Sequence, residues 1–223
     1  MLRHDFPAWT AAFSDRAEGD LRVSARSADA EPLADVQRRM LGGLGVAAVA
    51  VARQVHGPDV VAARGPLAGY LVGVGEGDGV LSTEPRLAAA VHVADCLPVA
   101  IGGAGGVAVL HCGWRGLAGG IVANGVRALR AAGARGELQA MIGPGAGGCC
   151  YETGDEVRAR LASFDAARGR LLDLPAIAAA QLAQAGVATI VAAGRCTICD
   201  ERYFSHRADG AATGRQGGYA WLR

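Results

Sequence analysis

Two apolar segments separated by a glycine-rich turn constrain the fold of this chain more than any other feature. Residues 86–101 are almost continuously apolar, and a second apolar run, residues 107–110, follows the turn at residues 102–106. Short apolar runs bounded by turn residues are typical of buried strands, and two of them joined by such a turn predict a β-hairpin. Asp95 and Pro98 interrupt the first run. The sequence therefore predicts a buried sheet that contains this hairpin.

Helical and strand patterns are mixed along the rest of the chain. We expect helices in residues 32–45, 117–132, 152–164 and 173–185, and further strands in residues 46–52, 138–142, 189–192 and 219–222. No self-similarity with a period of 20–50 residues and no linker is present. The sequence predicts one globular domain over residues 1–223, of the α/β (α+β) class with mixed sheets.

Small residues dominate the composition. The 34 Gly and 47 Ala account for 81 of the 223 residues, and only 5% of the residues are aromatic. The core is therefore expected to depend on close approach of backbones more than on bulky side chains. All 22 basic residues are Arg. Because Schiff-base chemistry and the P-loop both require a Lys ammonium, both are excluded.

The net charge and the hydropathy of the chain indicate which classes of partner and which compartment to expect. The net charge of +1 gives no basic patch for nucleic acid. The longest uncharged stretch, residues 174–194, contains Pro175 and Gly186 and is typical of a helix, a stop and a strand, so no membrane span is expected. The first residues carry charges and a Pro where a signal peptide would be apolar. Together with six cysteines in a chain of this length, this predicts a cytoplasmic protein with reduced thiols.

Three distant residues are candidate metal ligands. His56 and His111 each follow an apolar strand and stand close to a Gly, and Cys96 ends the first strand of the predicted hairpin. Imidazole and thiolate ligands suit zinc or copper. No close ligand pair is involved, so buried histidines and a packing thiol remain the alternative. Five histidines without a His-x-His pair are too few for a multicopper centre, and the HExxH and deaminase signatures are absent.

Two carboxylates and one basic residue accompany these candidates. Asp78 lies between two glycines, where a turn is the ordinary explanation. Asp95 interrupts an apolar strand, so it either bonds to the backbone or orients a metal-bound His or relays a proton. Arg115 opens a predicted helix, where a guanidinium and backbone N–H groups can bind an anion. Trp114 beside it can pack on a purine ring or belong to the core.

The remaining cysteines form two pairs. Cys149 and Cys150 are adjacent, and Cys196 and Cys199 form an isolated C-x-x-C. We interpret both pairs as packing thiols in preference to a zinc knuckle. The preceding residues 143–148 match GxGxxG only formally, because they do not begin a βαβ unit, and NAD binding is rejected.

The order of these motifs resembles the laccase-domain family, also described as multicopper polyphenol oxidoreductase, purine nucleoside phosphorylase and peptidoglycan editing factor. The blocks that carry the resemblance are Gln54-Val55-His56-Gly57, Ala94-Asp95-Cys96-Leu97-Pro98, His111-Cys112-Gly113-Trp114-Arg115-Gly116, Ile142-Gly143-Pro144, Phe204-Ser205-His206-Arg207 and Gly214-Arg215. They span nearly the whole chain.

The resemblance implies a layered α/β/β/α fold and a zinc ion, with copper as the alternative, held by His56, Cys96 and His111. Three protein ligands leave an open position, as in catalytic zinc sites. The resemblance also implies phosphorolysis of adenosine, inosine, guanosine and methylthioadenosine, and deamination of adenosine. Purine nucleoside and phosphate are then the partners. The family's phosphate-binding Arg corresponds to Arg38 or the adjacent Arg39, although Gln37 replaces the usual Asn before it.

Three hypotheses follow besides phosphorolysis. Cys96 could act as the nucleophile of a hydrolase that clears faulty peptidoglycan precursors, with His111 as its base. A copper-dependent polyphenol oxidase is the least favoured. A purely structural metal site is the third. We expect a monomer or a weak homo-oligomer.

Overall fold

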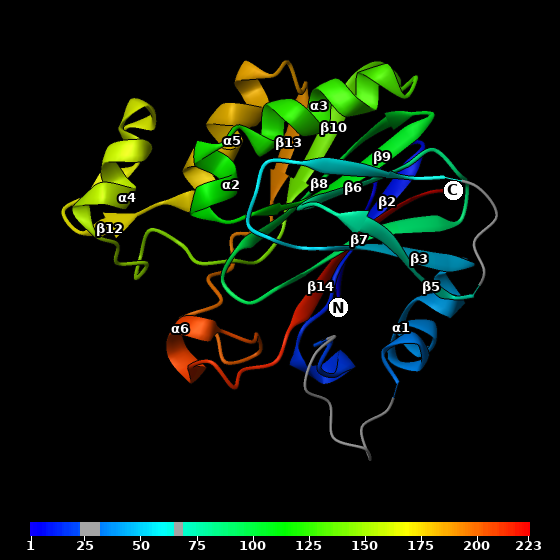
Figure 1. Cartoon of the computed structure of the whole chain (residues 1–223), viewed down its shortest axis with the longest axis horizontal. Coiled ribbons are helices and arrows are strands. Elements are labelled where there is room, and N and C mark those ends of the chain that lie inside the picture. Colours follow the sequence, from blue (N-terminus) through cyan, green and yellow to red (C-terminus); the bar gives the residue numbers. More distant parts are fainter. Residues whose placement is uncertain (23–31, 65–68) are drawn as a thin grey trace.

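Two six-stranded sheets lie face to face in the computed structural model, which describes residues 1–22, 32–64 and 69–223 (Figure 1). The first sheet contains, in spatial order, β1 (Leu2–Asp5), β2 (Trp9–Phe13), β14 (Gln216–Leu222), β7 (Leu87–Val93), β3 (Ala48–Arg53) and β5 (Leu71–Glu76). The second contains β13 (Thr189–Ala192), β10 (Arg135–Ile142), β8 (Leu97–Ala104), β9 (Gly106–Cys112), β6 (Gly79–Ser82) and β4 (Val60–Ala63). Both sheets mix parallel and antiparallel pairs.

The described residues form the helices α1 (Leu33–Leu41), α2 (Trp114–Ala118), α3 (Ile121–Ala131), α4 (Asp155–Arg160), α5 (Leu174–Gln184) and α6 (His206–Asp209). Of these, α1 covers the outer face of the first sheet, and α2, α3 and α5 cover the outer face of the second. Short 3-10 turns occupy Arg16–Glu18, Gly42–Leu44 and Ala162–Phe164, and β11 (Ala167–Arg168) pairs with β12 (Leu171–Leu172). In Figure 1, α1 lies below the sheets, and α2, α3 and α5 lie above them.

Three buried clusters correspond to the three interfaces between these layers. The first joins α1 to the outer face of the first sheet, through residues such as Val36 and Trp221. The second fills the space between the sheets. The third joins the outer face of the second sheet to α2, α3 and α5. Because each sheet is covered on both faces, its central strands, such as β7, β8 and β9, are apolar and buried along almost their whole length. The predicted class and the layered α/β/β/α arrangement are confirmed.

The few large side chains of the core lie against glycine. A Cβ on Gly102 would lie 2.6 Å from the Trp9 indole, and one on Gly143 would lie 2.5 Å from the Phe13 ring. Trp9 and Phe13 are fully buried. Real Cβ atoms essentially never approach so closely, so a methyl group at either glycine would displace a ring. The expectation of close backbone packing is confirmed, and it explains how a chain with few aromatic residues fills its core.

The predicted hairpin is present, but the predicted strand over residues 86–101 is wrong. β8 and β9 are antiparallel neighbours that turn between Gly103 and Gly106. The apolar run before them is divided, since β7 belongs to the first sheet and β8 to the second. The break falls at residues 94–96, where Asp95 has a left-handed φ of 83°. Both halves are equally apolar because both lie between covered faces, so hydropathy alone did not reveal the crossing between sheets.

Other predicted elements differ in their boundaries. The helix expected over residues 117–132 is two helices, α2 and α3, separated by Gly120 with a φ of 84°. The helix expected over residues 152–164 is limited to α4 and a 3-10 turn. Residues 69–79 are rich in Gly, yet they contain β5. Helices α1 and α5 and strand β13 lie where the sequence predicts them.

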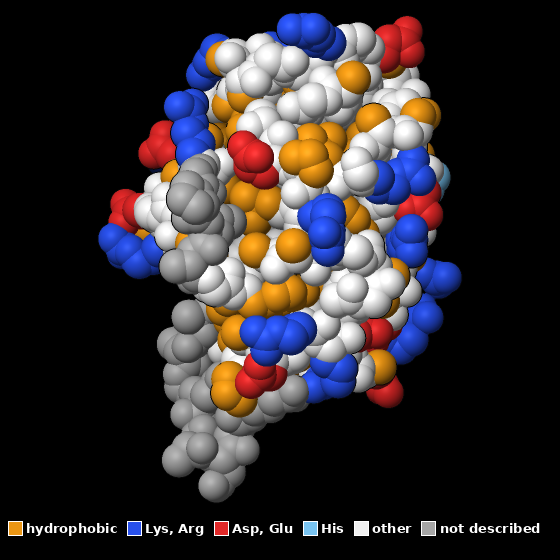
Figure 2. All heavy atoms as spheres, turned by 90° about the vertical axis from the view of Figure 1, so that its right-hand side faces the viewer, with side chains coloured by type: hydrophobic (Ala, Val, Ile, Leu, Met, Phe, Trp, Pro, Cys, Tyr) orange, Lys and Arg blue, Asp and Glu red, His pale blue; other side chains and the backbone are white. Residues whose placement is uncertain are grey.

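Helix composition and surface charge bear on membrane and nucleic-acid partners. Among the residues that the structure describes, no helix has the length and apolar composition required to span a bilayer. Figure 2 shows Arg side chains spread over one face of the molecule, with acidic side chains and small apolar areas between them. On this face several of the basic side chains gather along the right-hand margin, with acidic side chains between them.

Candidate metal centre

Three side chains from separate parts of the chain converge at one edge of the second sheet. His56 lies in the loop after β3, Cys96 immediately precedes β8, and His111 lies in β9. Their donor atoms lie within 4.8 Å of one another. The two imidazole rings meet edge to face, with 4.8 Å between their centroids. The structure thus brings together the three ligands that the sequence predicts.

The register of the hairpin decides that Cys96 and His111 are neighbours. Leu97 pairs with Cys112 and Pro98 pairs with His111, so Cys96 follows at the same open end. This register was not available from the sequence, because a shift by one residue would place one of the two on the opposite face. Gly113 completes the arrangement, since a Cβ there would lie 2.7 Å from Cys96 Sγ.

Asp78 connects both histidines. Its Oδ1 lies 2.7 Å from Nδ1 of His111 and accepts the backbone N–H of His56 at 2.8 Å, while Oδ2 accepts the N–H groups of Val55 and Gly57. Burial alone would raise the pKa of Asp78, but His111 and these N–H groups lower it to about 2. An ionised carboxylate only accepts, so His111 Nδ1 carries the proton and Nε2 is the nitrogen available to an ion.

Strained backbone lies beside two of the three candidate ligands. His56 has a φ of 63° and Asp95, directly before Cys96, has a φ of 83°. Left-handed conformations cost a non-glycine residue about 1–3 kcal/mol and persist where the surroundings impose them. For His56 the surroundings are the three N–H contacts to Asp78. The backbone conformations that position His56 and Cys96 therefore lower local stability, as is common at functional sites.

Cys96 and His111 each stabilise the charged form of the other. Burial raises the pKa of the half-buried Cys96 thiol, but His111 and His56 outweigh this effect and lower its pKa to about 6. Burial lowers the pKa of His111, yet Cys96 and Asp78 raise it to about 9. Without an ion, the pair is a thiolate beside an imidazolium. Such a pair can bind a cation after loss of one proton, or it can act as a nucleophile and its base.

Asp95 uses both carboxylate oxygens on a neighbouring segment. Oδ1 accepts the Thr197 hydroxyl at 2.8 Å, and Oδ2 accepts the backbone N–H of Arg207 at 2.7 Å. Its carbonyl accepts the N–H of Ala146. These contacts position the residue before Cys96. They correspond to the backbone-bonding alternative for Asp95, with Thr197 as an additional partner.

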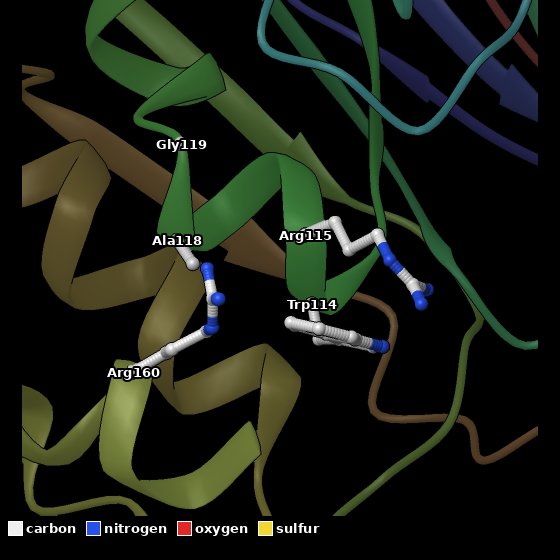
Figure 3. A pocket seen from close by; sticks show the side chains of 5 residues that line it. All are labelled: Trp114, Arg115, Ala118, Gly119 and Arg160. Atoms are coloured by element: carbon white, nitrogen blue, oxygen red, sulfur yellow. The ribbon is translucent and has the colours of Figure 1, made fainter. Parts of the chain in front are cut away.

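A pocket of about 430 Å³ lies along α2, directly after Gly113. Trp114, Arg115, Ala118, Gly119 and Arg160 line it. Figure 3 shows the Trp114 ring between the two arginines, with Arg115 from α2 on one side and Arg160 from α4 on the other. The guanidinium of Arg115 lies 4.3 Å from the Trp114 ring centroid. The sequence does not indicate Arg160, because an arginine on an exposed helix carries no local signal for a pocket.

Arg38 lies on a different layer, in α1. It pairs with Asp35 and stands over the Tyr70 ring. Its neighbour Gln37 contacts His92, whose backbone carbonyl accepts from Gln54 in the loop that carries His56. The structure therefore links α1 to the metal centre through Gln37, while the Arg38 side chain contacts groups of its own layer.

The donor chemistry of this centre fits a zinc ion. Two imidazoles and a thiolate are typical zinc ligands, and copper accepts the same set. His56 is exposed, so the ion would face solvent on that side. Three protein ligands with an exposed side leave a coordination position for an incoming molecule, as in catalytic sites.

A family model described as multi-copper polyphenol oxidoreductase laccase matches residues 10–223. The chain belongs to this family. A purine nucleoside phosphorylase of Deinococcus radiodurans is 35% identical to this laccase-domain chain over 234 residues, which cover 96% of this chain and 90% of the relative. The purine nucleoside phosphorylase YfiH of Shigella flexneri is 35% identical over 181 residues, covering 76% of this chain and 72% of that protein.

Solved structures show the same fold. The hypothetical protein YfiH of Bacillus licheniformis superposes with a TM-score of 0.87 at 24% identity, covering 96% of this chain and 93% of that one. YlmD of Geobacillus stearothermophilus has a TM-score of 0.79 at 26% identity, covering 99% and 98%. Although the family description names several coppers, the described residues of this laccase-domain chain gather only two imidazoles and one thiolate at this centre.

Proposed function

We propose that this laccase-domain protein is a zinc-dependent purine nucleoside phosphorylase. Its substrates would be adenosine, inosine, guanosine and methylthioadenosine, and adenosine would also be deaminated as a side reaction. The observation that supports this proposal is a three-donor centre with one exposed ligand, His56, whose His111 lies three residues before Trp114 of a pocket lined by that aromatic ring and two arginines. The names of the relatives from Deinococcus radiodurans and Shigella flexneri point in the same direction.

His56, Cys96 and His111 would hold the zinc. A zinc ion bound by three protein ligands supplies Lewis acidity and can activate water, which suits attack at the purine C6 in deamination. Asp78 acts as a positioning residue, because it fixes the proton of His111 on Nδ1 and holds the loop of His56. Asp95 positions Cys96 through its contacts to Thr197 and Arg207.

The α2 pocket would bind the nucleoside and phosphate. The Trp114 ring offers a face on which a purine can stack. Arg115 and Arg160 offer charge-assisted donors to phosphate, which would be held for attack on the ribose C1′ as the base leaves. We assign phosphate to these two arginines in preference to Arg38, which pairs with Asp35. A phosphate KM raised by Arg38→Ala and unchanged by Arg115→Ala would reverse this assignment.

The deciding experiment is turnover of inosine with phosphate by zinc-loaded protein. Hypoxanthine and ribose 1-phosphate should appear in equal amounts, and Cys96→Ala should abolish their formation. Adenosine without phosphate should give inosine, which tests the side reaction separately. Absence of phosphate-dependent turnover with all four nucleosides would refute the proposal.

A cysteine hydrolase is the second candidate. Cys96, His111 and Asp78 form a chain of contacts in which a thiol neighbours a base and the base neighbours a carboxylate. Asp78 contacts His111, and His111 lowers the pKa of Cys96 to about 6. This arrangement resembles the logic of a catalytic triad. The hydrolase would act on faulty peptidoglycan precursors. Its activity should survive chelation, and an electrophile should trap Cys96, whereas phosphorolysis should stop when zinc is removed.

A further inference from the structure

Outside the candidate metal centre, four of the six cysteines gather at one point. The Sγ atoms of Cys149, Cys150, Cys196 and Cys199 all lie within 4.8 Å of one another. We propose that these four thiols form a second metal site, which holds one zinc ion as a tetrathiolate and joins two loops beside the candidate metal centre. This inference does not depend on the proposed phosphorylase activity.

The sheet order brings the two cysteine pairs together. Strands β10 and β13 are parallel neighbours, with Ile142 paired to Ala192, so the loops that follow them leave the same edge of the sheet. Cys149 and Cys150 lie in the loop after β10, and Cys196 and Cys199 lie in the loop after β13. Backbone hydrogen bonds already join the two loops, since the N–H of Thr197 donates to Gly145 O at 3.0 Å.

The sulfur spacing suits a single ion. Cys150 Sγ lies 2.8 Å from Cys199 Sγ and 3.4 Å from Cys196 Sγ, and Cys149 Sγ lies 3.6 Å from Cys199 Sγ. Four sulfurs at about 2.3 Å from one zinc would be about 3.8 Å apart, so the sulfurs are close enough to share an ion, and the Cys150–Cys199 pair at 2.8 Å would separate by about 1 Å to hold it. A cluster of several metal atoms would need wider spacing. All four cysteines are free thiols, so no disulfide competes for them in this structure.

Backbone N–H groups point at one of these sulfurs, as they do in metal-thiolate sites. The N–H of Gly147 donates to Cys196 Sγ at 3.3 Å, and the N–H of Cys199 donates to the same atom. A donor from the residue three positions later is the geometry expected of a C-x-x-C turn around an ion. Such contacts stabilise thiolates and fix the orientation of ligands.

Four protein thiolates leave no open coordination position, which is the pattern of structural zinc sites. Cys149 and Cys199 are exposed, while Cys150 and Cys196 are half-buried, so the ion would lie at the surface. An ion there would add a second link between loops that backbone hydrogen bonds already join. Its contribution is therefore to folding and to loop position.

The site also has a physical connection to the candidate metal centre. Thr197 follows Cys196 directly and donates its hydroxyl to Asp95, and Ala146 in the other loop donates its N–H to the Asp95 carbonyl. Asp95 immediately precedes Cys96. Loss of the tetrathiolate ion should therefore loosen the contacts that position Cys96, and the first centre should bind zinc more weakly.

The first test counts zinc in purified protein. Wild type should contain two zinc ions per chain. The double variant Cys149→Ser/Cys199→Ser should contain one, and so should His56→Ala. Cys112→Ala should contain two, like wild type. Cys112 is the matched control, because it is a free thiol outside both groups. One zinc in wild type that is retained in the Cys149→Ser/Cys199→Ser variant would overturn the proposal.

The second test identifies the ligands. X-ray absorption on zinc-loaded His56→Ala should show a shell of sulfur alone at about 2.3 Å; a shell with nitrogen or oxygen would contradict the tetrathiolate. For the wild type, alkylation read by mass spectrometry is independent of any variant's folding. Zinc should protect these four cysteines, and chelator should expose them. Equal labelling with and without zinc, or a disulfide between any two of them in reductant, would overturn the site.

Discussion

The two groups of candidate metal ligands in this protein are built in different ways. His56, Cys96 and His111 come from three separate segments, and strained backbone and Asp78 hold them in place. The four clustered cysteines come from two adjacent loops without a buried carboxylate among them. The first group has three ligands, one of them exposed, and its His111 lies three residues before Trp114 of the α2 pocket, whereas the second group has four ligands. The difference separates a centre suited to chemistry from one suited to stability.

The largest expected effect is a loss of turnover, and only substitutions in the first group of ligands should cause it. Cys96→Ala removes a ligand of the first centre, so phosphorolysis of inosine should fall by more than about 100-fold, because loss of groups that merely support metal ligands already costs about 10–100-fold. The measurement is kcat/KM under zinc saturation. Cys112→Ala is the control, and its activity should stay near that of wild type. Equal turnover in Cys96→Ala would remove the distinction between the groups.

The next effect is on the metal affinity of the first centre. Asp78→Asn should weaken zinc binding there by about 10–100-fold, because an amide has one accepting oxygen, so either the contacts of Oδ1 to His111 and His56 or those of Oδ2 to the same loop are lost. Competition with a chromophoric chelator measures this affinity. Zinc held by the four cysteines should be unaffected, and a uniform loss at both sites would point instead to general unfolding.

Thermal stability should depend more on the four clustered cysteines than on the first group of ligands. Cys149→Ser/Cys199→Ser should lower the Tm by roughly 5 °C or more, because a structural ion contributes directly to folding free energy. His56→Ala should change the Tm less, since an open centre with strained backbone contributes little to stability. Calorimetry of the two variants at equal zinc concentration gives the comparison. A larger shift for His56→Ala would reverse the assignment of the two roles.

The smallest effect concerns the pocket beside the first group. Arg115→Ala should raise the phosphate KM about 10-fold, which corresponds to one charge-assisted contact, with kcat less affected. Arg160→Ala should behave similarly, because it lines the same pocket. Arg38→Ala is the comparison on the opposite layer. Unchanged phosphate KM in both pocket variants would place the phosphate elsewhere.

Much of the architecture was predictable because hydropathy reports burial. Helices α1 and α5, strand β13 and the β8–β9 hairpin lie where apolar spacing and turn residues indicate. The crossing between sheets at residues 94–96 was not predictable, since β7 and β8 are equally apolar. Hydropathy records that a strand is covered, but it does not record which sheet covers it.

The sequence by itself determined the donors, namely two imidazoles and one thiolate next to strand ends, and the family to which the chain belongs. Only the tertiary structure decided which donors meet. The hairpin register placed Cys96 beside His111, and the parallel pairing of β10 with β13 brought together cysteine pairs that are 46 residues apart between Cys150 and Cys196. Residue types fix what chemistry is available, whereas strand order and register, which depend on contacts between distant segments, fix where that chemistry can occur.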